Sequence, residues 1–201
     1  MGDENERLNR NTAELLRLRN EVARLKGDAS VSKQAHNDPF VQKALTWKTK
    51  EAKLRVLLEE MPDQKIPELS LLGEQTYLDV ARDANPDTDE GMRAALSRLR
   101  FIAENSFANT LQDALGRYTK ANNGQPPGNV ADLAAYIEPP MDNAGAILER
   151  YQILDTGTNV AGGWSGGWVV AQQKAVDPDH DFRWAISPVG YGPSAFKSSR
   201  Q

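Results

Sequence analysis

The chain has 201 residues, of which 39% are hydrophobic and 26% charged, and its net charge at pH 7 is −4. These values are typical of a folded, water-soluble protein, and the acidic balance argues against a protein that coats nucleic acid. The sequence contains no cysteine, which excludes disulfides, thiolate catalysis and cysteine-based zinc sites.

Residues 1–28 predict a coiled-coil helix, because apolar residues recur there with the spacing of a heptad. One seam position holds Leu8, Leu15 and Val22, the other holds Asn11, Leu18 and Leu25, and the flanking charges are Glu14, Arg19, Glu21 and Lys26. In a parallel pair, each flanking glutamate would face a cation of the other chain. We therefore expect homo-oligomerisation through residues 8–25, and a protein partner is also compatible with this helix.

A linker over residues 29–37 and a helical segment over residues 38–86 are expected next. Asp38 and Pro39 form an N-cap and a first helical residue, which predicts a helix to about residue 60. Its candidate buried stripe is Phe40, Ala44, Trp47, Leu54, Leu58 and Met61. A second, shorter helix is predicted over residues 68–84.

Residues 87–201 predict an α+β domain. Asp87 and Glu90 have the spacing of a capping box, and the helical period then continues to about residue 121. Asn123 and Gly124 are typical of a helix end, and a short helix is predicted over residues 129–137.

Short runs rich in valine, isoleucine and aromatic residues predict strands at residues 150–154, 167–175 and 182–186. Such a small sheet needs a cover on one face, and the long helix before it is the obvious candidate. The predicted fold class is therefore α+β, with an N-terminal coiled-coil helix, a helical middle, and a long helix packed on a small antiparallel three-stranded sheet.

An acidic cluster between the last two predicted strands has three possible interpretations. Its members are Asp177, Asp179, His180 and Asp181. The Asp-Pro-Asp sequence is typical of a hairpin turn. Carboxylates this close together also suit a hard cation such as calcium, or an acid/base pair in a hydrolase.

Two tryptophans, Trp164 and Trp168, lie in the glycine-rich stretch GGWSGGW. They could form a stacking platform for a sugar or a base. The alternative is that Trp168 begins a strand and packs in the core. No nucleophile-elbow sequence is present to support a serine triad, so the chain is more consistent with a non-enzymatic protein.

The sequence has no apolar run of the roughly 20 residues that a membrane span requires, and its first residues are acidic, unlike a signal peptide. As written, the chain is expected to be cytoplasmic. The alternative is a periplasmic or cell-surface protein from which an N-terminal anchor has been removed.

Residues 107–136, FANTLQDALGRYTKANNGQPPGNVADLAAY, resemble the soluble half of bacterial type II secretion pseudopilins and related type IV pilin-like proteins. In that family a long helix ends in an Asn-Gly-x-Pro type of loop, a short helix follows, and antiparallel strands close the domain. The resemblance covers roughly residues 90–196 and implies a pilin-like domain.

The stretch ELLRLRNEVARLK is similar to coiled-coil stretches of uncharacterised bacterial proteins, some of them sigma-factor extensions. Three functional hypotheses follow. The first is a self-associating scaffold or interaction protein that presents a pilin-like domain on a coiled coil. The second is a cation-binding or carbohydrate-binding module, or a hydrolase, that uses residues 164–181. The third is a transcription-associated accessory protein.

Overall fold

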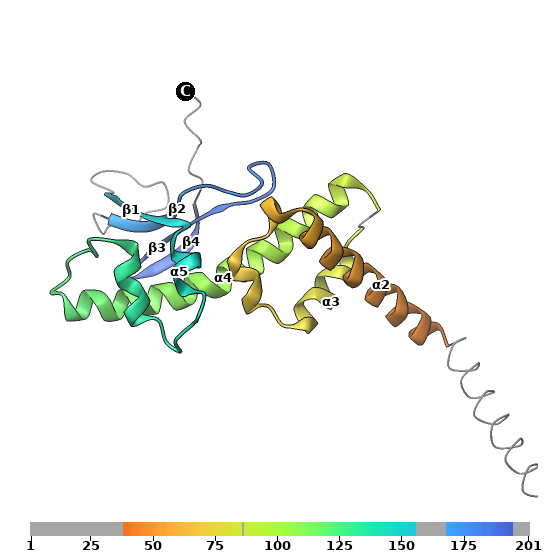
Figure 1. The fold of residues 1–201 in the computed structure, drawn as a ribbon, viewed down its shortest axis with the longest axis horizontal. Helices are drawn as coiled ribbons and strands as arrows, with labels where there is room; N and C mark the ends of the chain where they lie inside the picture. Colours follow the sequence, from red (N-terminus) through yellow and green to blue (C-terminus); the bar gives the residue numbers. More distant parts are fainter. Residues whose placement is uncertain (1–37, 86, 156–167, 195–201) are drawn as a thin grey trace, which may run out of the picture. The chain divides into compact units, whose positions relative to one another are not determined.

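The computed structural model describes residues 38–85, 87–155 and 168–194. Its helices are α2 (Pro39–Glu60), η1 (Pro62–Gln64), η2 (Pro67–Leu71), α3 (Glu74–Asp83), α4 (Asp89–Ala121), η3 (Val130–Tyr136) and α5 (Ala144–Leu148) (Figure 1). Its strands are β1 (Tyr151–Asp155), β2 (Trp168–Gln172), β3 (Arg183–Ser187) and β4 (Gly190–Ser194). The predicted coiled coil and linker lie outside the described residues.

Helix α2 begins where the sequence predicts, since the Phe40 N–H donates a hydrogen bond of 2.8 Å to Asp38 Oδ1. Leu54 and Leu58 are buried as expected. The predicted stripe is wrong at its N-terminal end, where the Phe40 side chain is 84% exposed and Ala44 is also exposed. Helical spacing shows which residues share a face, but burial also needs a partner surface, and the buried residues of α2 begin only at position 51.

The predicted helix over residues 68–84 is two separate elements, η2 and α3. The break lies at Leu72 and Gly73, whose ψ angles of 128° and 165° are those of extended backbone. Gly73 acts as the N-cap residue of α3. Leu69 and Val80, on either side of the break, are buried in the same core, so the apolar period continues across it. The sequence pattern alone therefore did not reveal the break.

Helix α4 contains 33 residues and is the long helix that the sequence predicts. Its N-cap is Thr88 rather than Asp87, because Thr88 Oγ1 accepts the Gly91 N–H at 3.1 Å. Asp87 instead forms an exposed ion pair with Lys53 at 2.8 Å. The predicted position of the cap was therefore wrong by one residue.

The end of α4 agrees with the prediction. Asn123 and Gly124 have φ angles of 53° and 80°, in the left-handed region that such residues favour, and the Gly124 N–H donates to Thr119 O at 2.8 Å. The predicted short helix that follows is the 3-10 helix η3, whose N-cap Asn129 forms a capping box with Asp132.

The sheet is antiparallel with strand order β1-β2-β3-β4. The three predicted strands are confirmed, but the predicted number of strands is wrong by one, because β4 pairs with β3 through a tight turn that puts Ser187 opposite Gly190. Two glycines and Pro193 give β4 a sequence with low strand propensity. Proline is tolerated there because β4 is an edge strand.

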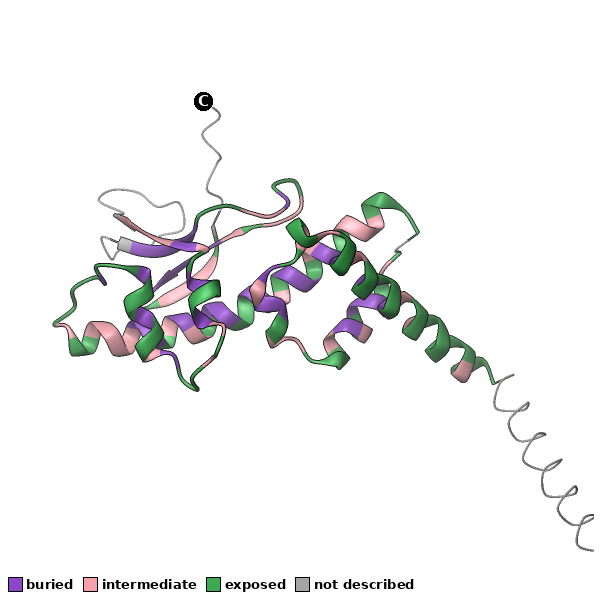
Figure 2. Ribbon diagram, in the orientation of Figure 1, coloured by how far each residue is buried: buried purple, intermediate pink, exposed green. Residues whose placement is uncertain are grey.

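Helix α4 belongs to two hydrophobic clusters. Its N-terminal half packs with α2, η2 and α3, and its C-terminal half packs with η3, α5 and one face of the sheet (Figures 1 and 2). The sheet residues on that face are Tyr151, Val170, Trp184 and Ile186. This arrangement confirms the α+β class.

None of the helices in the described part of the chain combines the length and the apolarity that crossing a membrane would require.

Candidate functional site

The acidic cluster at residues 177–181 lies in the loop between β2 and β3, which we call the β2–β3 loop (residues 173–182), and arginines of α4 bind it. Arg93 forms a bidentate ion pair with Asp177, with Nε–Oδ2 and Nη2–Oδ1 distances of 2.8 and 2.7 Å. The same Arg93 Nη2 also donates to Asp179 at 3.1 Å. Arginine is suited to this role because its planar fork matches a carboxylate.

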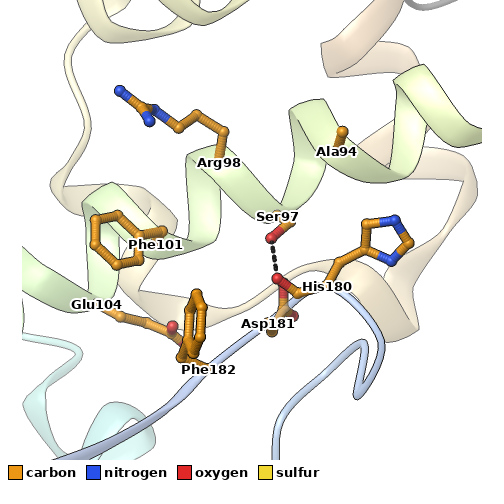
Figure 3. Close-up of a pocket in the computed structure, with 8 residues that line it drawn as sticks. All are labelled: Ala94, Ser97, Arg98, Phe101, Glu104, His180, Asp181 and Phe182. Carbon is orange, nitrogen blue, oxygen red and sulfur yellow. Dashed lines mark hydrogen bonds between the residues drawn. The ribbon is translucent and has the colours of Figure 1, made fainter. Parts of the chain in front are cut away.

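A second arginine, one heptad later on α4, holds the other end of the cluster. Arg100 donates to Asp181 through Nε and Nη2 at 2.8 and 3.0 Å. Between the two arginines, Ser97 Oγ donates to the His180 carbonyl oxygen at 2.9 Å (Figure 3). The spacing of Arg93, Ser97 and Arg100 places all three on one face of the helix.

The cluster is also bonded internally as a turn. The His180 and Asp181 N–H groups donate to the Asp177 carbonyl oxygen at 3.1 and 2.7 Å. The Asp177 N–H donates to Asp181 Oδ2 at 2.9 Å, and the Asp179 N–H donates to Asp177 Oδ1 at 3.2 Å. These bonds are the turn chemistry that the Asp-Pro-Asp sequence indicates.

His180 lies between two carboxylates. Its Nε2 is 3.1 Å from Glu90 Oε1, and its Nδ1 is 3.3 Å from Asp177 Oδ2. The hydrogen bond with Glu90 raises the pKa of His180 above its usual value, and Asp177 adds to this. The Arg93 guanidinium holds the pKa of Asp177 well below its usual range. The loop is therefore an ion-paired network in which Asp177 is charged at neutral pH.

A second charge network is buried beside this loop. Arg150, next to β1, donates to Glu68 of η2 and, at 2.9 Å, to Glu104 Oε1 of α4. Gln172 at the end of β2 donates to the same Glu104 oxygen at 2.8 Å. The side chains of Glu68, Glu104 and Arg150 are only 0%, 5% and 18% exposed.

One guanidinium therefore serves two buried carboxylates. Burial raises the pKa of Glu104 to about 6, although Arg150 and Gln172 act in the opposite direction. Burial also raises the pKa of Glu68, against the effect of Arg150. The backbone N–H of Trp184 donates a hydrogen bond of 2.9 Å to Gln172 Oε1. This bond fixes the orientation of the Gln172 side chain and directs its amide NH2 group toward Glu104.

The two networks meet at a pocket of about 370 Å³ between α4 and the β2–β3 loop. Figure 3 shows the rings of Phe101 and Phe182 on the same side of the pocket as the Glu104 side chain, with the His180 ring on the other side. Phe182 is 58% exposed, a large value for a phenylalanine. The pocket thus has aromatic walls and a buried carboxylate, and it is the candidate functional site.

Comparison of the chain with protein-family models, with curated proteins and with solved structures found no match. The site is therefore interpreted from its own geometry.

The structure brings together the four residues of the acidic cluster that the sequence singled out. Asp177 and Asp181 are held in ion pairs by arginines, Asp179 is exposed, and His180 and Asp181 line the pocket. Within the described ranges, Asp, Glu and His side chains form no group of three or more that could hold a metal ion. The calcium hypothesis stays a prediction.

The other predicted site residues are not placed. The coiled-coil residues from Leu8 to Lys26 and Trp164 lie outside the described residues. Trp168 is the first residue of β2, as the strand interpretation expects, and its side chain is not described. The stacking platform therefore stays a prediction.

Sequence reasoning missed the residues that define the pocket and its networks, namely Arg93, Arg100, Phe101, Glu104 and Arg150. One local signal was available. Arginines spaced by seven on a helix, with a serine between them, form a polar stripe on a helix whose buried residues are otherwise mostly apolar. That stripe predicts a polar or acidic partner, although not which one.

Proposed function

We propose that this protein is a non-enzymatic interaction protein that self-associates through residues 8–25 and presents its α+β domain on a parallel coiled coil. The observation that carries the proposal is that the carboxylates of the acidic cluster are bound in ion pairs within the protein. The cluster was the strongest candidate for chemistry in the sequence, and Arg93 and Arg100 hold it in structural ion pairs. The hydrogen bonds from Arg93 lower the pKa of Asp177, which leaves that carboxylate little basicity for acid/base catalysis.

The order of elements in the domain also supports the proposal. A long helix, a loop with a short helix, and an antiparallel sheet follow one another along the chain, which is the order that the resemblance to pilin-like proteins implies. Proteins of that kind act by assembling with other subunits. In this proposal the coiled coil supplies the assembly and the α+β domain is the part that is displayed.

The test is the mass of the full chain in solution, measured by light scattering during gel filtration. One chain has a mass of 22.2 kDa, so a parallel pair has twice this mass. Leu18→Asp puts a charge in the seam of the coiled coil, and we expect it to give the mass of a single chain. The matched control is Leu16→Asp, because Leu16 lies outside the seam by one residue.

The parallel orientation of the two helices can be tested by exchanging charges at the flanking positions. Glu14→Lys would face Arg19 in a parallel pair and weaken it, and adding Arg19→Glu would restore the pairing. A single-chain mass for the unmodified protein, or equal effects of Leu18→Asp and Leu16→Asp, would rule the proposal out.

A further inference from the structure

The pocket between α4 and the β2–β3 loop contains a carboxylate, that of Glu104, whose hydrogen-bonding capacity is only partly satisfied by the protein. Glu104 is 4% exposed and lines the pocket. Both hydrogen bonds that it receives from described residues, from Arg150 and Gln172, reach the same oxygen, Oε1. Among the described residues, none is shown to donate a hydrogen bond to Oε2, so this carboxylate oxygen is available to a ligand in the pocket.

The buried ion-pair network at Glu104 does not balance in charge. Glu68 and Glu104 share the single guanidinium of Arg150, whereas Asp181 has its own partner in Arg100. This buried set therefore carries one more negative charge than positive. An excess buried charge is costly, and a bound cation would offset that cost.

The aromatic walls of the pocket suit an organic cation. Phe101 and Phe182 present aromatic rings to the pocket, and a ring face attracts a cation within about 6 Å of its centroid. The Phe101 ring is positioned by Trp184, with a centroid distance of 5.4 Å. A bare metal ion would gain little from these walls because it prefers several oxygen ligands.

We propose that this pocket binds a small organic ammonium ion, with the ammonium group at Glu104 Oε2 and its alkyl part between Phe101 and Phe182. The volume of about 370 Å³ lies within the range of small-molecule sites, roughly 300 to 1,000 Å³. The excess negative charge of the Glu68, Glu104 and Arg150 network disfavours an anion beside Glu104. Arg98 at the rim is exposed, so water and salt screen its charge.

The experiment is titration of the full chain with n-butylammonium at pH 7.5. Binding is measured by calorimetry and by the NMR signals of the phenylalanine rings. At this pH the Glu104 carboxyl group, with a pKa of about 6, is mostly ionised. The neutral analogue n-butanol is the ligand control. We expect butylammonium to bind at least about tenfold more tightly than butanol, the difference that about 1.4 kcal/mol produces.

Two variants assign the binding to this pocket. Glu104→Gln removes the charge with little change in shape, and Phe182→Ala removes a wall at a position that is already 58% exposed, so the fold should tolerate it. We expect the first to abolish the preference for the amine and the second to weaken binding at least about fivefold. Phe40→Ala is the matched control, because Phe40 is also an exposed phenylalanine and does not line this pocket.

A lysine-containing tripeptide with blocked ends distinguishes the sources of the ammonium group. If the tripeptide binds less tightly than butylammonium, the ligand is a free amine. If it binds more tightly, the proposal of a small free ligand is overturned and the site takes a lysine side chain. Equal binding of butylammonium and butanol, or amine binding that survives Phe182→Ala unchanged, would overturn the proposed site.

Discussion

The Arg100 guanidinium and the Asp181 carboxylate form an ion pair across 81 positions of the sequence, with both side chains almost completely buried, at 1% and 5% exposure. Two parallel hydrogen bonds of 2.8 and 3.0 Å join them. This pair fixes the β2–β3 loop against α4 and so determines the shape of the pocket. Removing one partner would leave the other charge buried without compensation.

We therefore predict that Arg100→Met lowers the free energy of unfolding by about 3 to 5 kcal/mol. The double variant Arg100→Met with Asp181→Leu should recover most of this loss, because neither charge then remains. Arg98→Met is the control, since Arg98 is exposed on the next face of α4, and it should change stability by less than about 0.5 kcal/mol. Urea unfolding followed by circular dichroism measures all three.

The two aspartates that contact Arg93 should differ in importance. The Asp177 side chain is 7% exposed and that of Asp179 is 79% exposed. We predict that Asp177→Ala costs about 3 kcal/mol, because it leaves Arg93 without its main partner and removes the turn hydrogen bond that Asp177 Oδ1 accepts from the Asp179 N–H, whereas Asp179→Ala costs less than about 1 kcal/mol. Equal losses in thermal unfolding would contradict the ion-pair description of the loop.

Calcium provides a separate test of the same loop. Because arginines and backbone N–H groups occupy the carboxylates of Asp177 and Asp181, we expect excess calcium to leave the melting temperature unchanged relative to a chelator. A calcium-dependent rise in melting temperature that disappears in Asp179→Ala would instead favour the cation-binding hypothesis.

The pKa of about 6 at Glu104 predicts a pH dependence of stability. Its ordinary value is 4.5, so between pH 4.5 and 6 the folded protein binds more protons than the unfolded chain, and stability falls as the pH rises. The shift of about 1.5 units corresponds to about 2 kcal/mol. His180 contributes in the same direction, since its raised pKa stabilises the fold at low pH and this contribution is lost as the pH rises through that pKa.

Glu104→Gln separates the two contributions. Between pH 4.5 and 7.5, the difference in unfolding free energy between variant and wild type should move by about 2 kcal/mol in favour of the variant. The groups that surround Glu104 are Arg150, Glu68, Gln172 and Tyr151, and none of them is changed by this substitution. A difference that stays constant with pH would show that Glu104 is not the titrating group.

Two glycines of α4 should respond oppositely to alanine. A Cβ at Gly91 would lie 2.1 Å from the Asn85 carbonyl oxygen, a backbone atom, so Gly91→Ala must displace the start of the helix. We predict a loss of about 1 to 3 kcal/mol. Gly116 has open space around its Cβ position, and Gly116→Ala should gain about 0.5 to 1 kcal/mol from helix propensity. Thermal unfolding of the two variants measures both effects.

The parts of the fold that local chemistry determines were predictable. The cap at Asp38, the length of α4 and its end at Asn123 and Gly124 follow from residues close together in the sequence, and so do the positions of β1, β2 and β3. Strand β4 was missed because its glycines and proline conceal a strand that only pairing with β3 reveals. The break at Gly73 was missed because both sides contribute to the same core.

The candidate site was predictable only in part. The acidic turn was visible in the sequence, but its partners Arg93 and Arg100 are 84 and 81 residues away. The network of Glu104 and Arg150 likewise joins residues 46 positions apart. Charged residues on a helix are usually solvated, so the polar stripe of Arg93, Ser97 and Arg100 indicates a polar partner at most, and the partners themselves are known only from the tertiary contacts.

Helix α4 places Leu96 and Leu99 in one hydrophobic cluster and Phe107 and Leu111 in the other. Its hydrogen-bonded turns run without interruption from one cluster to the other. Loss of either cluster would strip half of a continuous helix of its packing, so the two should melt in a single cooperative transition. Backbone amides on both halves of α4 should then exchange with deuterated solvent at the same slow rate, set by global unfolding.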